Sequence, residues 1–300
     1  MQALKNWNLH LNNKMKFFYL SFLAFAPGFI FANDFNEPIN DLKIRSTFEK
    51  HLGKLRDDGK LIEANTLTTQ LKAENHIQLR LPKTEETLPT PSSVYQKNKK
   101  GILCFGNIYK CDRCDNWHGN IAGGFIISKE GLAVTNYHVM ENSKASAFGG
   151  MTIDGKMYPV TKVLASSKRD DLAIVQLEGE DFHPLTIANG GDVGSGVTVI
   201  SHPEGRFYTV SKGIISRYYT LRSGKEKGSH RMAITADFAK GSSGSAVFND
   251  NGEVVGVVAS TNSIYYNKKD GIERNLQMVI KSCIPSGSIL RLLNSGKPKN

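Results

Sequence analysis

The residues best suited to chemistry in this 300-residue chain are a histidine, two aspartates and a cluster of serines, each beside an apolar run. His138 lies near the end of GLAVTNYHVM, Asp170 and Asp171 directly precede LAIVQL, and the serines lie in AKGSSGSAVF at 239–248. A serine hydroxyl becomes a nucleophile when an imidazole takes its proton and a carboxylate holds that imidazole in the right tautomer. Backbone N–H groups must also face the developing oxyanion, which favours a glycine just before the nucleophile. These residue types indicate acyl transfer through an activated serine.

Each of these residues also has a plainer interpretation. A lone histidine beside a strand is usually structural, acids before strands are commonly turn residues, and Gly/Ser clusters are usually loops. The nucleophile elbow of α/β-hydrolases reads G-x-S-x-G between a strand and a helix. Here Ser245 occupies the fifth position, and AVFNDNGEVVGVVA is typical of two strands joined by a turn. The serine cluster therefore disfavours an α/β-hydrolase.

The elements that must position these residues are short and β-rich from about residue 101 onward. Roughly a dozen apolar runs are bounded by Gly, Asp and Asn, which predicts an all-β sandwich or a pair of barrels. Among these later segments only IPSGSILRLLN, at 284–294, has the pattern of a helix.

The segment before the β-rich region has a different pattern. Residues 36–78 carry leucines and a phenylalanine near a 3.6-residue period, interrupted at Asp57-Asp58-Gly59, which predicts two helices. Residues 82–93 are rich in Pro and Thr without periodicity, which is typical of a linker. We therefore expect a helical extension or propeptide at 33–81 and a linker at 82–93.

The N-terminus resembles an export signal. Bases at 14 and 16 precede an apolar run from Phe17 to Phe31, and Ala32 then offers a small-residue cleavage site. The run is shorter than the roughly 20 residues of a membrane span and contains Pro27-Gly28, so we expect no stable span. Residues 1–32 are thus predicted to be a signal peptide of a periplasmic or secreted protein. Met15 directly precedes this pattern, so translation could start at Met1 or there.

Charge and composition exclude some classes of protein. With 40% hydrophobic residues the chain can form a substantial core, and its net charge is +10. The densest basic run, at 222–231, contains an acid and no aromatic residue, as expected of a solvated loop. A nucleic-acid interface would need a longer basic face with stacking residues, so nucleic acid is not an expected partner.

The ordered motifs together resemble the chymotrypsin-like serine proteases. TNYHV, DLAIVQL and GSSGSAVF follow one another in that family's order, and ISHPEGRFYTVSKGIIS and LQMVIKSCIPSGSILRLL are similar to its HtrA-like bacterial branch. The resemblance covers residues 94–293. It implies two perpendicular six-stranded β-barrels with catalysis between them, preceded by the helical extension and followed by a short C-terminal helix. Only a tail at 294–300 follows, so a PDZ domain is not expected.

The resemblance also assigns roles to individual residues. It makes His138 the general base, Asp171 its orienting carboxylate and Ser243 the nucleophile of a serine endopeptidase. The backbone N–H groups of Gly241 and Ser243 then form the oxyanion hole. Protein or peptide substrates are implied, and the oligomeric state is left unassigned. The alternative is a catalytically silent peptide-binding or chaperone-like module on the same fold.

Substrate specificity depends on a single acid. Asp237 stands six residues before Ser243, where trypsin-type relatives carry the acid that selects basic side chains. HtrA-like proteins have a different loop at this point and often prefer small aliphatic residues. An acid at this corner is also a common turn residue. Asp237 is therefore a candidate specificity residue by analogy alone.

Four cysteines leave three interpretations open. In an exported protein, Cys104, Cys111, Cys114 and Cys283 could form structural disulfides. Cys111, Cys114 and His118 could instead bind a structural zinc ion, with Cys104 or Cys283 completing the set, or the thiols could stay reduced or sense redox state. The peptidase chemistry requires no cofactor. A zinc-stabilised envelope protein without serine reactivity is the third functional alternative.

Overall fold

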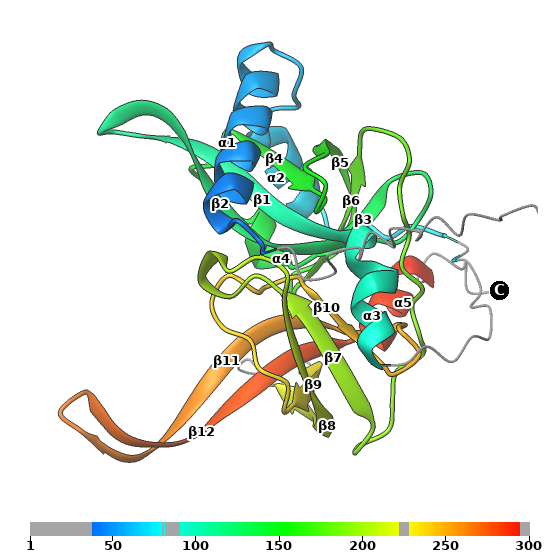
Figure 1. The fold of residues 1–300 in the computed structure, drawn as a ribbon, viewed down its shortest axis with the longest axis vertical. Helices are drawn as coiled ribbons and strands as arrows, with labels where there is room; N and C mark the ends of the chain where they lie inside the picture. The colour runs from blue at the N-terminus through cyan, green and yellow to red at the C-terminus, as the bar shows by residue number, and fades with distance from the viewer. Residues whose placement is uncertain (1–37, 80, 82–90, 222–227, 295–300) are drawn as a thin grey trace, which may run out of the picture. The chain divides into compact units, whose positions relative to one another are not determined.

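The fold consists of two six-stranded antiparallel barrels that follow one another along the chain (Figure 1). The computed structural model describes residues 38–79, 81, 91–221 and 228–294. The chain divides into two units, 1–38 and 39–300, and both barrels lie in the second. The predicted signal peptide, the tail after residue 294 and most of the 82–93 linker lie outside the described residues.

The first barrel closes in the strand order β1-β2-β3-β6-β5-β4. Leu172, Ala173, Ile174 and Val175 of β6 are all buried, because this strand lies between β3 and β5 in a closed sheet. The six strands are β1 (Ile102–Cys111), β2 (Cys114–Ile126), β3 (Leu132–Thr135), β4 (Ala147–Met151), β5 (Met157–Ser167) and β6 (Leu172–Leu177).

The second barrel closes in the order β10-β11-β12-β9-β8-β7. Its longest hairpin turns at Asp270-Gly271, where both φ angles are positive, 54° and 77°, as a two-residue hairpin turn requires. The strands are β7 (Gly196–Ser201), β8 (Thr209–Leu221), β9 (Ser229–Ile234), β10 (Ala246–Phe248), β11 (Val254–Lys269) and β12 (Ile272–Pro285). The predicted all-β fold with two six-stranded barrels is confirmed.

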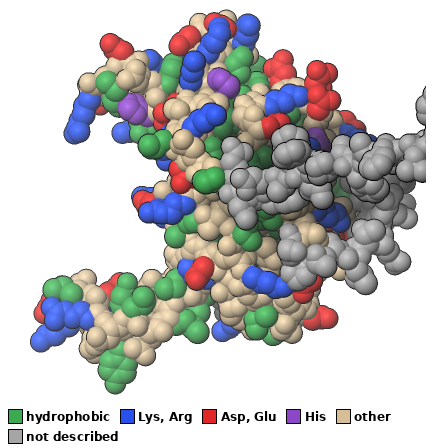
Figure 2. Space-filling model, viewed as in Figure 1, with side chains coloured by type: hydrophobic (Ala, Val, Ile, Leu, Met, Phe, Trp, Pro, Cys, Tyr) green, Lys and Arg blue, Asp and Glu red, His purple; other side chains and the backbone are tan. Residues whose placement is uncertain are grey.

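The outer part of the β11–β12 hairpin extends away from its barrel (Figure 1). Residues 254–259 of β11 are buried, whereas the rest of that strand and residues 272–278 of β12 are mostly exposed. Hydrophobic side chains are visible on this hairpin in Figure 2, and the large exposed ones are Ile264, Tyr266, Ile272, Leu276 and Met278.

The two helices expected in the N-terminal extension are present and pack on the first barrel. α1 (Asp41–Asp57) begins after Asn40, whose side chain accepts a hydrogen bond from the Lys43 N–H at 2.9 Å. It buries Phe48 and Leu52 against β1, β2, β4 and β5. α2 (Ala64–Lys72) packs on β5 and buries Leu67 and Leu71. None of the described helices is long and apolar enough to cross a membrane.

Three further α-helices and two short 3-10 helices, η1 (Lys99–Gly101) and η2 (Pro203–Gly205), complete the described part of the chain. α3 (Pro91–Asn98) begins inside the expected linker and binds the second barrel, where Asn98 Nδ2 donates to the Gly252 carbonyl at 3.2 Å. α4 (Tyr137–Met140) is a single turn after β3. α5 (Ser286–Asn294) is the expected C-terminal helix and contacts β11, β12 and also β5, so it bridges the barrels. One cluster of buried apolar side chains likewise includes residues of both barrels.

Candidate active site

The pairing of β3 with β6 brings His138 and Asp171 together. Thr135 and Ala173 are register partners, so the turn of α4 after β3 faces the turn that precedes β6. His138 Nδ1 lies 2.9 Å from Asp171 Oδ2 and 3.0 Å from Oδ1, and the His138 backbone N–H donates to Oδ1 at 3.0 Å. A carboxylate only accepts hydrogen bonds, so Nδ1 carries the proton and Nε2 is left as the basic nitrogen.

The turn at Asp171 is held in an uncommon backbone conformation. Asp171 has φ 62°, in the left-handed region, and Asn136 Nδ2 donates to its carbonyl oxygen at 3.0 Å. Asp170 is engaged elsewhere, because both of its oxygens accept from the Arg169 guanidinium at 3.0 and 2.8 Å. Asp171, the acid assigned by resemblance, is thus the one that contacts His138. Asp170 forms an ion pair with Arg169 instead.

Ser243 lies in the loop between β9 and β10 and faces the same cleft as His138. Both residues line a cavity of about 440 Å³. The Ser243 hydroxyl donates to the Ala259 carbonyl at 3.3 Å, and among the described residues it makes no hydrogen bond to His138. The Gly123 N–H of the first barrel donates to the Ser243 carbonyl at 2.7 Å, which ties this loop across the interface between the barrels. Catalytic hydrogen bonds are often formed only once substrate is bound, so this geometry is compatible with catalysis.

In the described structure, two backbone N–H groups of the serine loop have no acceptor. Gly241 and Gly244 have φ angles of 94° and 83°, so the loop turns sharply on either side of Ser243. The N–H groups of Ser242, Gly244 and Ser245 all donate to backbone carbonyls. Within the described part of the chain those of Gly241 and Ser243 meet no acceptor. Two free N–H donors beside a hydroxyl can stabilise an oxyanion.

Helix α1 also contributes to the wall of the cleft. Arg45 lines the cavity and donates to the Gly119 carbonyl at 3.1 Å, while Glu49 Oε1 accepts from the Gly119 N–H at 2.9 Å. These two residues therefore fix α1 to β2 beside the cleft. Sequence reasoning missed them, because the one available signal was an oppositely charged pair four residues apart, which is common on any helix surface.

Residues 122–257 match the trypsin-like peptidase domain family, and this range contains His138, Asp171 and Ser243. The chain contains a trypsin-like peptidase domain. A probable periplasmic serine endoprotease, DegP-like, from Buchnera aphidicola subsp. Baizongia pistaciae (strain Bp) is 30% identical over 224 residues, 71% of this chain and 47% of that protein. Serine endoprotease DegS from Haemophilus influenzae (strain ATCC 51907 / DSM 11121 / KW20 / Rd) is 28% identical over 181 residues, 59% of this chain and 52% of that protein.

The peptidase domain is therefore homologous to HtrA-like serine proteases, as the sequence motifs indicated. The chain spans about half the length of each of these two relatives. The solved structure of the HtrA-type protease AlgW with a decapeptide superimposes with a TM-score of 0.53 at 19% identity, covering 69% of this chain and 67% of that one. This likeness shows that the two proteins share the chymotrypsin-like fold.

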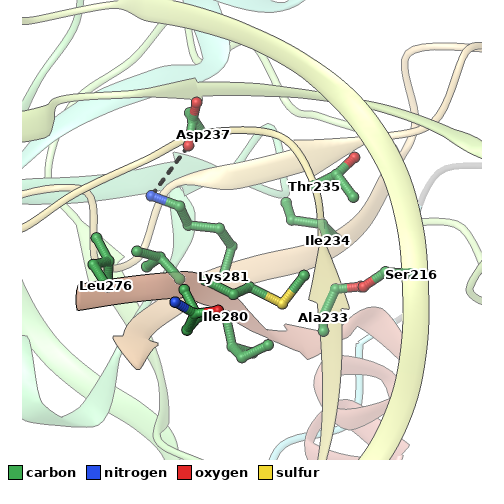
Figure 3. Close-up of a pocket in the computed structure, with 11 residues that line it drawn as sticks. Ser216, Ala233, Ile234, Thr235, Asp237, Leu276, Ile280 and Lys281 are labelled. Atoms are coloured by element: carbon green, nitrogen blue, oxygen red, sulfur yellow. Dashed lines mark hydrogen bonds and ion pairs between the residues drawn. The ribbon is translucent and has the colours of Figure 1, made fainter. Parts of the chain in front are cut away.

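Asp237 does not line the cleft of the peptidase domain that holds His138 and Ser243. It lies at a second cavity, of about 470 Å³, between β8, β9 and β12 (Figure 3). Its Oδ1 is 3.2 Å from Lys281 Nζ, which also donates to the Phe238 carbonyl at 2.6 Å. The Asp237 side chain is 87% exposed, whereas that of Lys281 is 14% exposed. Because the ammonium group of Lys281 partly neutralises the Asp237 carboxylate, this placement gives no support to Asp237 as a residue that selects basic side chains.

All four cysteines are free thiols in the structure, so it contains none of the disulfides that were one of the three interpretations. Cys104 is buried in β1 and Cys283 in β12, that is, in different barrels. The sulfurs of Cys111 and Cys114 are 3.5 Å apart, well beyond the roughly 2.05 Å of a disulfide. Two hydrogen bonds lower the pKa of Cys111 to about 7: the larger effect comes from the Arg113 backbone and the smaller from the Cys114 thiol.

In the described structure neither Cys104 nor Cys283 joins Cys111, Cys114 and His118 as a fourth zinc ligand. Burial raises the pKa of the Cys104 thiol to about 12 and that of Cys283 still further, as expected for thiols enclosed by apolar side chains. Cys104 and Cys111 are seven positions apart on β1, roughly 23 Å along an extended strand. Cys111, Cys114 and His118 do meet at the tip of the β1–β2 hairpin, with their ligand atoms within 4.8 Å of one another.

Proposed function

We propose that this chain is an exported serine endopeptidase that cleaves peptide bonds through Ser243, His138 and Asp171. The observation that carries the proposal is the pair of contacts, 2.9 and 3.0 Å, between the Asp171 carboxylate and His138 Nδ1, in a cleft that Ser243 also lines. Homology to serine endoproteases supports a peptidase in general. The roles of the individual residues are the part that we infer.

In the proposed mechanism, the Ser243 side chain first rotates from the Ala259 carbonyl toward His138. His138 Nε2 then takes the hydroxyl proton while Oγ attacks the scissile carbonyl carbon, and Asp171 stabilises the imidazolium that forms. The carbonyl oxygen becomes an oxyanion and accepts hydrogen bonds from the N–H groups of Gly241 and Ser243. His138 returns the proton to the leaving amine, and the acyl-enzyme remains.

Hydrolysis of the acyl-enzyme repeats these steps with water. His138 Nε2 takes a proton from the water, whose oxygen attacks the acyl carbon, and the same two N–H groups hold the second oxyanion. Collapse of this intermediate returns the proton to Ser243 Oγ and releases the new carboxyl end of the substrate.

Unfolded or flexible polypeptides are the substrate class that we propose. The cleft is open and contains both signs of charge, from Arg45, Glu141, Glu204 and Lys240, so no single charge is selected along its walls. The periplasmic names of the relatives and the signal-like N-terminus support a periplasmic or secreted enzyme.

A fluorophosphonate probe tests the proposal directly, because it reacts only with an activated serine. We expect the purified protein to be labelled and Ser243→Ala to be unlabelled. Ser245→Ala is the matched control, since the Ser245 hydroxyl is buried two residues away without a hydrogen-bond partner in the described structure. Labelling that persists in Ser243→Ala would contradict the assignment.

A second candidate is a silent peptide-binding module on the same fold. It is favoured by one observation, that the Ser243 hydroxyl donates to Ala259 rather than to His138. Wild-type protein that resists the probe, yet retains a fluorescent unfolded peptide in an anisotropy titration without cutting it, would establish this alternative.

A further inference from the structure

The tip of the β1–β2 hairpin carries a cluster that the peptidase mechanism does not use. Cys111 and Cys114 are register partners across the two-residue turn Asp112-Arg113, so their side chains lie side by side. His118 follows Cys114 by four residues along β2, which places it on the same face of the strand. The register shifts between Lys110 and Cys111, so the strand is irregular where the imidazole approaches the thiols.

The three donor atoms converge on one point. Cys111 Sγ is 3.5 Å from Cys114 Sγ and 3.2 Å from His118 Nε2, and Cys114 Sγ is 3.1 Å from the same nitrogen. Bonds of about 2.3 Å to sulfur and 2.0–2.1 Å to nitrogen separate tetrahedral zinc ligands by about 3.5–3.8 Å. The observed separations are within a few tenths of an ångström of these values, so only a small outward adjustment would admit an ion.

We propose that Cys111, Cys114 and His118 form a zinc site with an open fourth position. Two thiolates and an imidazole are a donor set that suits Zn²⁺, whereas Mg²⁺ and Ca²⁺ prefer oxygen ligands. A disulfide between the two cysteines would leave the histidine without a role, although its nitrogen lies close to both sulfurs. Among the described residues no fourth ligand joins the cluster, and Cys114 is exposed, so water or an external donor takes the last position.

The ion would also fix how the hairpin meets helix α1. Trp117, next to His118, donates from Nε1 to the Asp57 carboxylate at 3.2 Å. Its ring lies directly over Gly53, where an added Cβ would come within 2.3 Å of Cδ1. Fixing His118 therefore orders Trp117 against α1, the helix that binds Gly119 beside the cleft.

Cobalt binding to the reduced protein tests the site independently of catalysis, in a Ser243→Ala background. We expect one equivalent of Co²⁺ to give a thiolate-to-cobalt charge-transfer band and the d–d bands of tetrahedral coordination, both lost when Zn²⁺ is added. Cys111→Ser together with Cys114→Ser should abolish the bands, and His118→Asn should weaken binding by at least about tenfold. His51→Asn is the control, because His51 is exposed on α1 and outside the cluster. Absence of the bands in reduced protein, or their survival without both cysteines, overturns the site.

Hydrogen exchange tests the link to α1. Zinc should slow amide exchange in residues 48–57 in the Ser243→Ala protein and leave the variant that also lacks both cysteines unchanged. Equal exchange with and without zinc, in protein that binds cobalt, overturns the link to α1.

Discussion

At the scale of single residues, Asp171 holds His138 by two hydrogen bonds, because its Oδ1 accepts one from the His138 backbone N–H and one from the ring Nδ1–H. Asp171→Asn should lower kcat by about 10⁴-fold with little change in KM, because an amide permits the wrong histidine tautomer. Steady-state cleavage of an unfolded protein measures both constants. Asp170→Asn is the control, since it breaks only the pair with Arg169, and kcat should stay within a few fold. Equal losses in the two variants would contradict the assignment.

Gly241 allows a second test at this scale. Gly241 has a φ of 94°, and Gly241→Ala places a Cβ about 2.8 Å from the His202 carbonyl oxygen. The loop must therefore shift, and its free N–H groups no longer point at the position of the oxyanion. We expect kcat to fall by about 10²–10³-fold. Gly194 has the same φ of 94° but open space around an added Cβ. Gly194→Ala should therefore cost stability alone, as measured by urea unfolding and kcat on one preparation.

At the scale of elements, α1 is held by two apolar side chains that face the first barrel. Phe48→Ala should lower the free energy of unfolding by about 3–5 kcal/mol, because it opens a cavity under a fully buried ring. Leu42 lies on the same helix but is 81% exposed, so Leu42→Ala should change it by less than about 0.5 kcal/mol. Urea titrations give both values, and a small effect of Phe48→Ala would mean that the helix is loosely docked.

Features that depend on interactions between residues close in sequence could be predicted, whereas those that depend on contacts between distant segments could not. The 3.6-residue pattern predicted α1 and α2, because Leu52, Leu67 and Leu71 recur along single helices. Their docking could not be predicted, since it depends on contacts such as that from the Val163 N–H to the Gln70 side chain, 93 residues apart in sequence.

The candidate site could likewise be predicted only in part. Motif order predicted which side chains would meet in the cleft. It could not predict that the Ser243 hydroxyl donates to Ala259 or that Lys281 opposes Asp237, because both partners lie on distant strands of the second barrel. The Cys-x2-Cys spacing with His118 allowed a zinc site as one of three interpretations. Its fourth ligand could not be judged from the sequence, because the spacing does not tell that Cys104 and Cys283 face barrel cores.

At the scale of the whole molecule, His202 joins the barrels as a neutral side chain. It is fully buried, and its Nε2–H donates to the Leu103 carbonyl of β1 at 3.1 Å, while Nδ1 accepts from the Tyr208 N–H at 3.1 Å. Both ring nitrogens of His202 are therefore hydrogen-bonded in the neutral form, one as a donor and one as an acceptor. Burial lowers the pKa of His202 to about 4.

This histidine should make the stability of the protein fall in mild acid. In the unfolded chain its pKa is about 6.5, so between pH 6.5 and 4 the unfolded state binds the extra proton. The contribution is fully present above pH 6.5, and about 3 kcal/mol is lost by pH 4. Urea unfolding at pH 7 and pH 4.5 measures the loss, and His202→Gln should reduce this pH dependence. An unchanged dependence in that variant would assign the effect to other groups.

Residues 260–275, the end of the β11–β12 hairpin farthest from the barrel, are almost all exposed, so the length of this end is nearly independent of the rest of the protein. Side chains alternate between the two faces of a strand, so removing two residues from each arm and rebuilding the Asp270-Gly271 turn leaves every remaining side chain on its original face. Removing one from each arm reverses the faces beyond the cut. Over evolutionary time this hairpin can therefore lengthen or shorten in steps of two residues per arm while both barrels keep their cores.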